Sequence, residues 1–147
     1  MRLLLAFTLL ASLTPLAPAE DKIWSAVVIA SNAAKPGEPP PQLRAFAGRL
    51  KRVFGANQFE LVGSTTETID QAEENWIVPS PNFWFSVKAR RATSVEARGG
   101  YLLNLQLFQD KRLLVESAAR LAPGSPLFIR GPMCARGQIV IVLQVQQ

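Results

Sequence analysis

The residues best suited to acid–base chemistry are three carboxylates that lie close together in the chain, Asp70, Glu73 and Glu74. Two carboxyl groups can cleave a glycosidic bond when one acts as an acid and the other as a base or nucleophile. The three residues stand in a polar stretch between predicted strands, where charged side chains are usually solvated. Glycoside hydrolysis is therefore an alternative interpretation, which requires the carboxylates to converge in a cleft.

Other catalytic and metal-binding patterns find little support. The chain has no histidine, which excludes serine–histidine and cysteine–histidine catalysis and histidine-ligated metals. Ser86 and Lys88 have the spacing of a serine–lysine dyad on one strand face, but both residue types are common. Met133 and Cys134 are soft ligands suited to copper(I), yet the only other methionine is Met1. We expect neither catalysis nor a metal or other cofactor.

The N-terminus has the organisation of a signal peptide. A positive start is followed by an apolar run at residues 3–13 and by small residues at Ala17 and Ala19, spaced for a signal peptidase. The run is shorter than the roughly 20 residues of a membrane-spanning helix. We expect residues 1–19 to be removed and residues 20–147 to form a single domain without a transmembrane segment, exported to the periplasm or the extracellular space. An uncleaved anchor is the alternative.

Charge and cysteine content constrain the partners. The formal net charge of +5 is mildly basic and does not require a nucleic-acid partner, which an exported protein rarely meets. Cys134 is the only cysteine, so an intrachain disulfide is excluded. We expect its side chain to be buried or half-buried, as free cysteines usually are.

Residues 42–54 are predicted to form an amphipathic helix. A proline-rich loop precedes this segment, and Gly55 fits the position that ends a helix. Its apolar residues recur at helical spacing on one face: Leu43, Phe46, Ala47, Leu50, Val53 and Phe54. Such a stripe needs a sheet face to cover.

The remaining sequence is typical of strands. The unbroken apolar run at residues 23–30 predicts a central strand, and residues 83–90 alternate between apolar and polar side chains. Further strands are predicted at residues 59–62 and 65–69, 76–78, 101–108, 113–116, 127–130 and 138–145, with turns at 109–112 and 122–126. This order predicts an α+β fold with a mostly antiparallel sheet or sandwich and one helix packed on it. The first strand, the helix and the next strand would form a crossover unit if the strands are parallel.

Two groups of residues are candidates for binding. The first group is predicted on one face of the strand at 83–90 and comprises Trp84, Lys88, Arg90 and Arg91. The second group is on the helix and comprises Arg44, Arg49 and Arg52. Aromatic residues and arginine are enriched at protein interfaces, which motivates the first group.

Each group also has a structural explanation. The helix is the simplest cover for the Trp84 face. Cations near a helix C-terminus stabilise the helix through its dipole, which accounts for the arginines of the second group. The basic residues at 88–98 are expected to pair across the sheet with the acidic residues at 60–74.

Together these features predict a small exported protein of the cell envelope that acts as a binding or assembly module. The expected partner is an envelope protein or a glycan. One alternative is a hydrolase acting on cell-wall material through paired carboxylates. The other is a structural envelope protein that self-associates through an exposed sheet edge. The sequence does not determine the oligomeric state.

Overall fold

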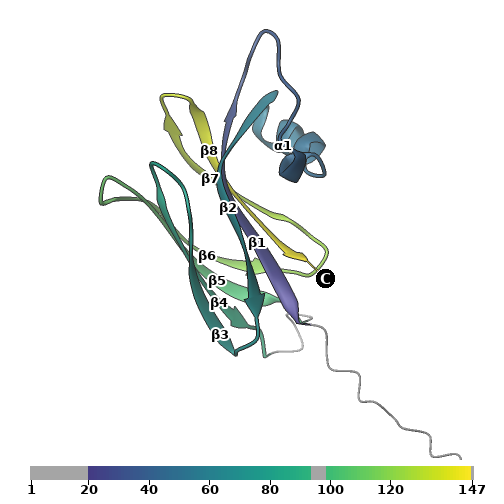
Figure 1. The fold of residues 1–147 in the computed structure, drawn as a ribbon, viewed down its shortest axis with the longest axis vertical. Coiled ribbons are helices and arrows are strands. Elements are labelled where there is room, and N and C mark those ends of the chain that lie inside the picture. The colour runs from purple at the N-terminus through teal and green to yellow at the C-terminus, as the bar shows by residue number, and fades with distance from the viewer. Residues whose placement is uncertain (1–19, 94–98, 147) are drawn as a thin grey trace, which may run out of the picture.

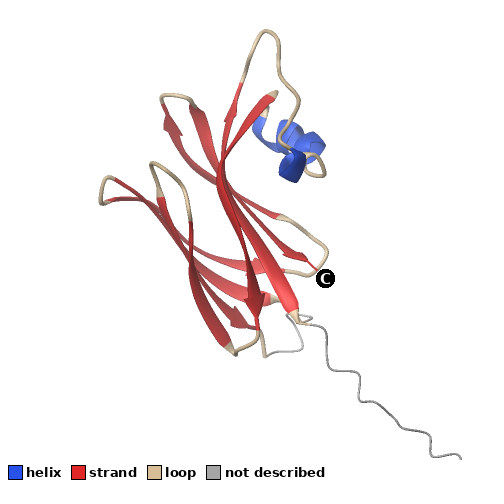
Figure 2. Ribbon diagram, in the orientation of Figure 1, coloured by secondary structure: helices blue, strands red, loops and turns tan. Residues whose placement is uncertain are grey.

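The computed structural model describes residues 20–93 and 99–146, so the predicted signal peptide lies outside the described residues. Within these ranges, eight strands form two four-stranded antiparallel sheets that pack face to face (Figures 1 and 2). The strand order is β2-β1-β8-β7 in sheet A and β3-β4-β5-β6 in sheet B. The strands are β1 (Asp21–Ser31), β2 (Gln58–Ile69), β3 (Glu73–Val78), β4 (Trp84–Arg91), β5 (Tyr101–Gln109), β6 (Arg112–Leu121), β7 (Leu127–Cys134) and β8 (Gly137–Gln146). The predicted mostly antiparallel arrangement is confirmed, and of the two predicted alternatives, a sheet or a sandwich, the structure has the sandwich.

The core between the sheets follows from the alternation of apolar side chains. Phe85, Val87 and Ala89 of β4 are fully buried and face residues such as Ile139 and Ile141 of β8. Successive side chains of a strand point to opposite faces, so this alternation buries one face of sheet B and leaves its other face available. The predicted inward face of β4 is therefore confirmed.

The central position of β1 is also confirmed. This strand lies between β2 and β8 and is antiparallel to both. Ile23 and Val27 face the core of the sandwich, whereas Trp24, Ala26 and Val28 face the helix. The crossover unit considered for β1, the helix and β2 is wrong, because a parallel pair is required for it and this pair is antiparallel.

The helical segment is shorter than predicted. A 3₁₀ turn, η1 (Pro41–Leu43), is followed by a bend and then by α1 (Ala47–Phe54), so a continuous helix over 42–54 is wrong. Tight 3₁₀ geometry brings residues three apart onto one side, and Leu43 and Phe46 both reach sheet A in this way. Gly55, at φ 67°, ends α1 as expected. The fold is therefore mostly β with one short helix.

The apolar face of α1 was predicted too broadly. Phe46, Leu50 and Phe54 lie at successive i, i+4 positions and pack on sheet A, with the ring of Phe46 stacked on that of Trp24 at 5.7 Å. Val53 lies outside this line and is 54% exposed, so its predicted burial is wrong. Among the described residues, no helix has the length and apolar character needed to cross a membrane.

The hairpins match the predicted turns. Asp110 and Lys111 have positive φ angles of 48° and 64°, as in the two-residue turns that join antiparallel strands, here β5 and β6. The strand that follows this turn extends to Leu121 and is longer than the predicted 113–116. Cys134 is half-buried at the end of β7, as expected.

Candidate binding surface

The two sheets differ in what covers their outer faces. The helix α1 packs on the outer face of sheet A, on the side away from sheet B (Figure 1). Trp84, on the outer face of sheet B, is 59% exposed. The expectation that the helix covers this tryptophan is therefore wrong, because the apolar residues of β1 and β8 on sheet A take the helix instead.

The strand registers define the outer face of sheet B. Side chains directly opposite one another on neighbouring strands form cross-strand rows. From one end of the face to the other, the rows are Glu73–Arg90–Leu102–Arg120, Asn75–Lys88–Asn104–Ala118, Ile77–Ser86–Gln106–Glu116 and Trp84–Phe108–Leu113. The face thus has two arginines and Glu73 at one end, mainly amide and hydroxyl groups with Lys88, Glu116 and Ile77 in the middle, and aromatic and apolar residues at the other end.

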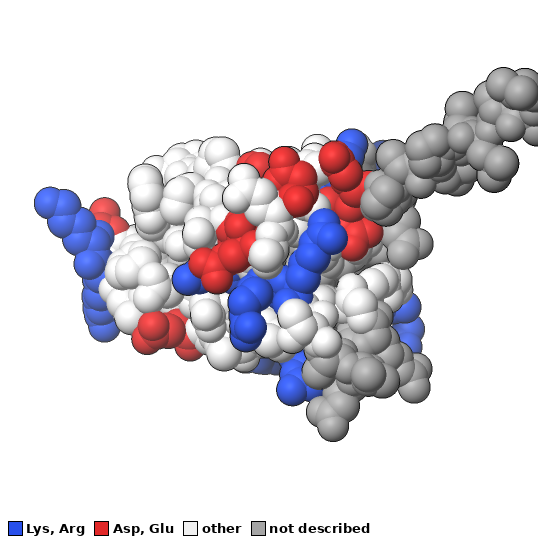
Figure 3. Space-filling model, turned by 90° about the horizontal axis from the view of Figure 1, so that it is seen from below, with Lys and Arg blue, Asp and Glu red and all other residues white. Residues whose placement is uncertain are grey.

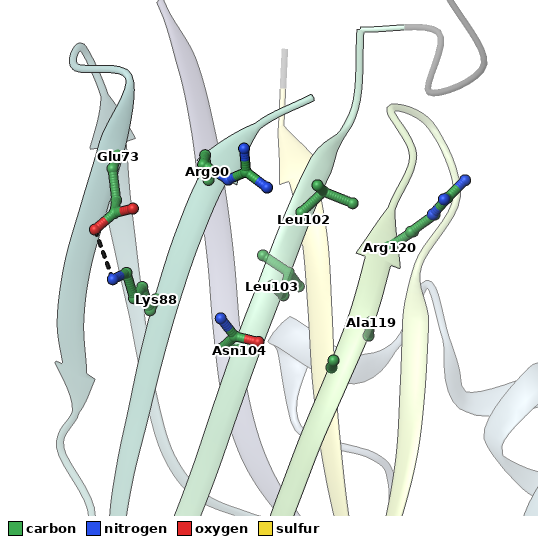
Figure 4. Close-up of a pocket in the computed structure, with 9 residues that line it drawn as sticks. Glu73, Lys88, Arg90, Leu102, Leu103, Asn104, Ala119 and Arg120 are labelled. Carbon is green, nitrogen blue, oxygen red and sulfur yellow. Dashed lines mark ion pairs between the residues drawn. The ribbon is translucent and has the colours of Figure 1, made fainter. Parts of the chain in front are cut away.

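Three depressions in the described part of the chain hollow this face. The first has a volume of about 550 Å³ and is lined by residues that include Glu73, Arg90 and Arg120 (Figure 4). The second, of about 680 Å³, shares Lys88 and Asn104 with the first, so the two form one continuous groove. The third, of about 380 Å³, is lined by Trp84, Phe108, Asp110 and Lys111 at the aromatic end.

Polar side chains on this face are partly paired with each other. The ammonium nitrogen of Lys88 lies 2.8 Å from a carboxylate oxygen of Glu73, and the Gln106 amide donates a hydrogen bond of 3.0 Å to Glu116. The expected pairing of acidic and basic residues across the sheet is confirmed for Lys88 and Glu73. Arg90 and Arg120 form no ion pair with another described residue.

The structure separates Arg91 from the other members of the first group. Its guanidinium donates a hydrogen bond to the backbone carbonyl of Ile69, and its backbone N–H donates one of 3.2 Å to the carbonyl of Ala72. Grouping Arg91 with Trp84 and Arg90 on one face is therefore wrong, because neighbouring residues of a strand point to opposite faces. Through these two hydrogen bonds, Arg91 links β4 to the end of β2 and to the loop that follows it.

The residues of the second group lie on two segments of the chain, the turn before α1 and α1 itself. Arg44 lies in the bend before α1 and makes an exposed ion pair of 3.5 Å with Glu38, a type of pair that contributes little to stability. Arg49 and Arg52 are exposed on α1 and lie three residues apart, so they share a side of the helix. Lys51 and Arg52 stand in the last helical turn, where the helix dipole favours cations.

The three carboxylates do not meet in the groove. Glu73 and Glu74 belong to β3 and not to the predicted linker, and as neighbours they point to opposite faces. Glu73 is the only described acidic residue that lines the first depression, and Glu116 lines the second. A hydrogen bond with Asp70 raises the pKa of Glu74, and desolvation and the nearby charge of Asp70 add to this effect. Within residues 20–93 and 99–146, no three potential metal-ligating side chains of His, Cys, Asp or Glu come together.

Charges of both signs lie side by side at one end of the molecule. Figure 3 shows acidic and basic side chains interspersed there, with no broad field of one sign in that view. Recognition of a charged partner through this end therefore depends on individual side chains.

The sequence reasoning missed the contributions of β5 and β6 to the open face. Residues 101–108 are predicted only as a strand, and Arg120 lies beyond the predicted strand at 113–116. The alternation itself indicated that Asn104, Gln106 and Phe108 point away from the core. Their position beside Lys88 and Arg90 depends on strand pairing, which the alternation does not specify.

Comparison of the chain with known protein families, with curated proteins and with solved structures found no match. The functional argument therefore depends on the surface itself.

Proposed function

We propose that this protein is an exported, non-catalytic binding module of the cell envelope that holds a glycan on the outer face of sheet B. The observation that carries the proposal is the uncovered face itself, where two arginines and a band of amide and hydroxyl groups line a continuous groove and an exposed tryptophan lines a separate depression beyond it. The sequence of residues 1–19 supports export, because it has the features of a signal peptide.

The chemistry of the groove favours a glycan over a protein partner. Protein interfaces have apolar, aromatic centres, and the residues that dominate binding cluster there. The centre of this face is formed instead by Ser86, Lys88, Asn104 and Gln106. Amide and hydroxyl groups both donate and accept hydrogen bonds, as sugar hydroxyls do. Trp84 adds a flat apolar surface at one end, against which a sugar ring can lie.

The position of the carboxylates supports binding without cleavage, because Asp70 and Glu74 do not line the groove. Glycoside hydrolysis requires two carboxyl groups about 5–10 Å apart on either side of the scissile bond. Glu73 is instead paired with Lys88, and the proximity of Asp70 raises the pKa of Glu74. A bound chain would meet only one of these groups in the first depression.

The test is retention of the protein on an immobilised, protein-free polysaccharide fraction from the envelope of the native organism. The wild-type protein should be retained, and Trp84→Ala and Asn104→Ala should each weaken retention, because Asn104 lines the groove and Trp84 lines the third depression on the same face. Arg49→Ala is the matched control, because Arg49 is exposed on α1 over the other sheet. Absence of retention, or loss of retention in the Arg49 variant alone, would overturn the proposal.

A further inference from the structure

We infer that the bound glycan is acidic and that Arg90 and Arg120 recognise carboxylate groups on it. This inference rests on the proposed function, because it specifies the ligand of the same face. The two arginines occupy one cross-strand row, on either side of Leu102 (Figure 4).

The first depression has an excess of positive charge. Its described lining residues include Lys88, Arg90 and Arg120 as cations and Glu73 as the single anion, and the adjoining second depression adds Glu116, which accepts a hydrogen bond from Gln106. The pair between Glu73 and Lys88 neutralises one of these cations. The charges of Arg90 and Arg120 therefore complement an anionic ligand.

The geometry favours separate carboxylates over a single phosphate group. Arg90 and Arg120 lie on β4 and β6, two strand spacings or about 10 Å apart at the backbone. A planar guanidinium binds a carboxylate through two parallel hydrogen bonds. Two such sites at this spacing suit a chain that carries several singly charged groups.

The length of the face requires an extended ligand. Trp84 and Arg90 are separated along β4 by about 20 Å at the usual rise of a strand. A ligand that contacts both must be an oligomer, with an uncharged ring at the tryptophan and acidic groups at the arginines. An acidic peptide would also carry the negative charges that the two arginines can bind. However, the centre of the groove is lined mainly by polar residues and offers few of the apolar contacts that a peptide's side chains make.

The experiment compares the native polysaccharide fraction with the same fraction after chemical reduction of its carboxyl groups to alcohols. The half-saturating concentration should rise at least tenfold after reduction, because charge-assisted hydrogen bonds are lost. Arg90→Gln and Arg120→Gln should each weaken binding of the native fraction about tenfold and leave binding of the reduced fraction unchanged. Trp84→Ala should weaken binding of both fractions, and Arg49→Gln should change neither.

The outcomes separate this inference from the proposed function. Equal binding of the native and reduced fractions would overturn the acidic ligand and leave glycan binding intact. Binding of neither fraction would overturn both. Poly-glutamate serves as the acidic peptide probe, and tighter binding of poly-glutamate than of the native fraction would also overturn the inference. Thermal unfolding of each variant verifies that it is folded.

Discussion

The indole nitrogen of Trp76 lies 3.2 Å from the hydroxyl oxygen of Ser25, and this hydrogen bond joins sheet B to sheet A inside the sandwich core. The two residues are 51 positions apart in the chain. Ser25 is fully buried and is the only polar residue in the buried core of the described ranges. Each partner therefore satisfies a polar group of the other that would otherwise be buried without a hydrogen bond.

Ser25→Ala should lower the free energy of unfolding by about 1–3 kcal/mol, because it leaves the Trp76 N–H buried without an acceptor. Trp76→Phe removes the donor, and the double variant should lose less than the sum of the two single variants. Chemical denaturation of the four proteins measures this coupling. Additive losses would show that the hydrogen bond does not link the two side chains.

Gly63→Ala should destabilise the fold because β2 passes close to the chain after β3. A Cβ atom at position 63 would lie 1.8 Å from the backbone oxygen of Pro79, so the strands would have to move apart. We expect a loss of about 1–3 kcal/mol. Gly48→Ala on α1 is the matched control, because nothing lies within 4 Å of its added Cβ, and it should stabilise the helix by about 0.5–1 kcal/mol. Denaturation midpoints that move together in both variants would contradict this account.

Trp84→Ala should change the free energy of unfolding by less than about 0.5 kcal/mol, because the side chain is mostly exposed. The same substitution at Trp24 should cost about 3–5 kcal/mol, because that ring is 7% exposed and is stacked on Phe46 beneath α1. Thermal unfolding of the two variants compares the open and covered sheet faces directly. A similar decrease in the free energy of unfolding for both variants would mean that the Trp84 side chain is buried.

Tyr101 should ionise at unusually high pH. Burial, together with the hydrogen bond of 2.6 Å that its hydroxyl donates to Asp21, raises the pKa of Tyr101 to about 12. Folding thus favours the protonated phenol, so this contribution to stability is complete below pH 10 and is lost as the pH rises from about 10 to 12. Phenolate absorbance reports this residue alone, because the chain has one tyrosine.

Asp21→Asn is the comparison for this titration. It should lower the pKa of Tyr101, because the negative charge is lost, yet leave it above 10, because the ring stays buried. A wild-type titration midpoint near 10 would contradict the described contact between Tyr101 and Asp21.

Local patterns in the sequence were enough to predict the strands and their faces. The uninterrupted apolar run of β1 required cover on both sides, and the alternation in β4 and β5 assigned each side chain to the core or to the outside. Gly55 marked the end of α1, and the polar turn at 109–112 marked a hairpin. These features depend on residues close in the chain, where period and turn preferences act directly.

Tertiary structure alone decided which sheet receives the helix and which face remains open. The strands β4 and β5 of sheet B alternate, whereas β1 and β8 of sheet A are buried on both faces, and long-range packing of Phe46 and Leu50 against Val140 and Val142 of β8 places the helix on sheet A. That choice leaves Trp84 exposed. It is also strand pairing that brings Arg120 into one row with Arg90, although the two residues lie on different strands and are distant in the chain. The period of a strand specifies the direction of a side chain but not its neighbour, so the candidate surface exists only once the strands have paired.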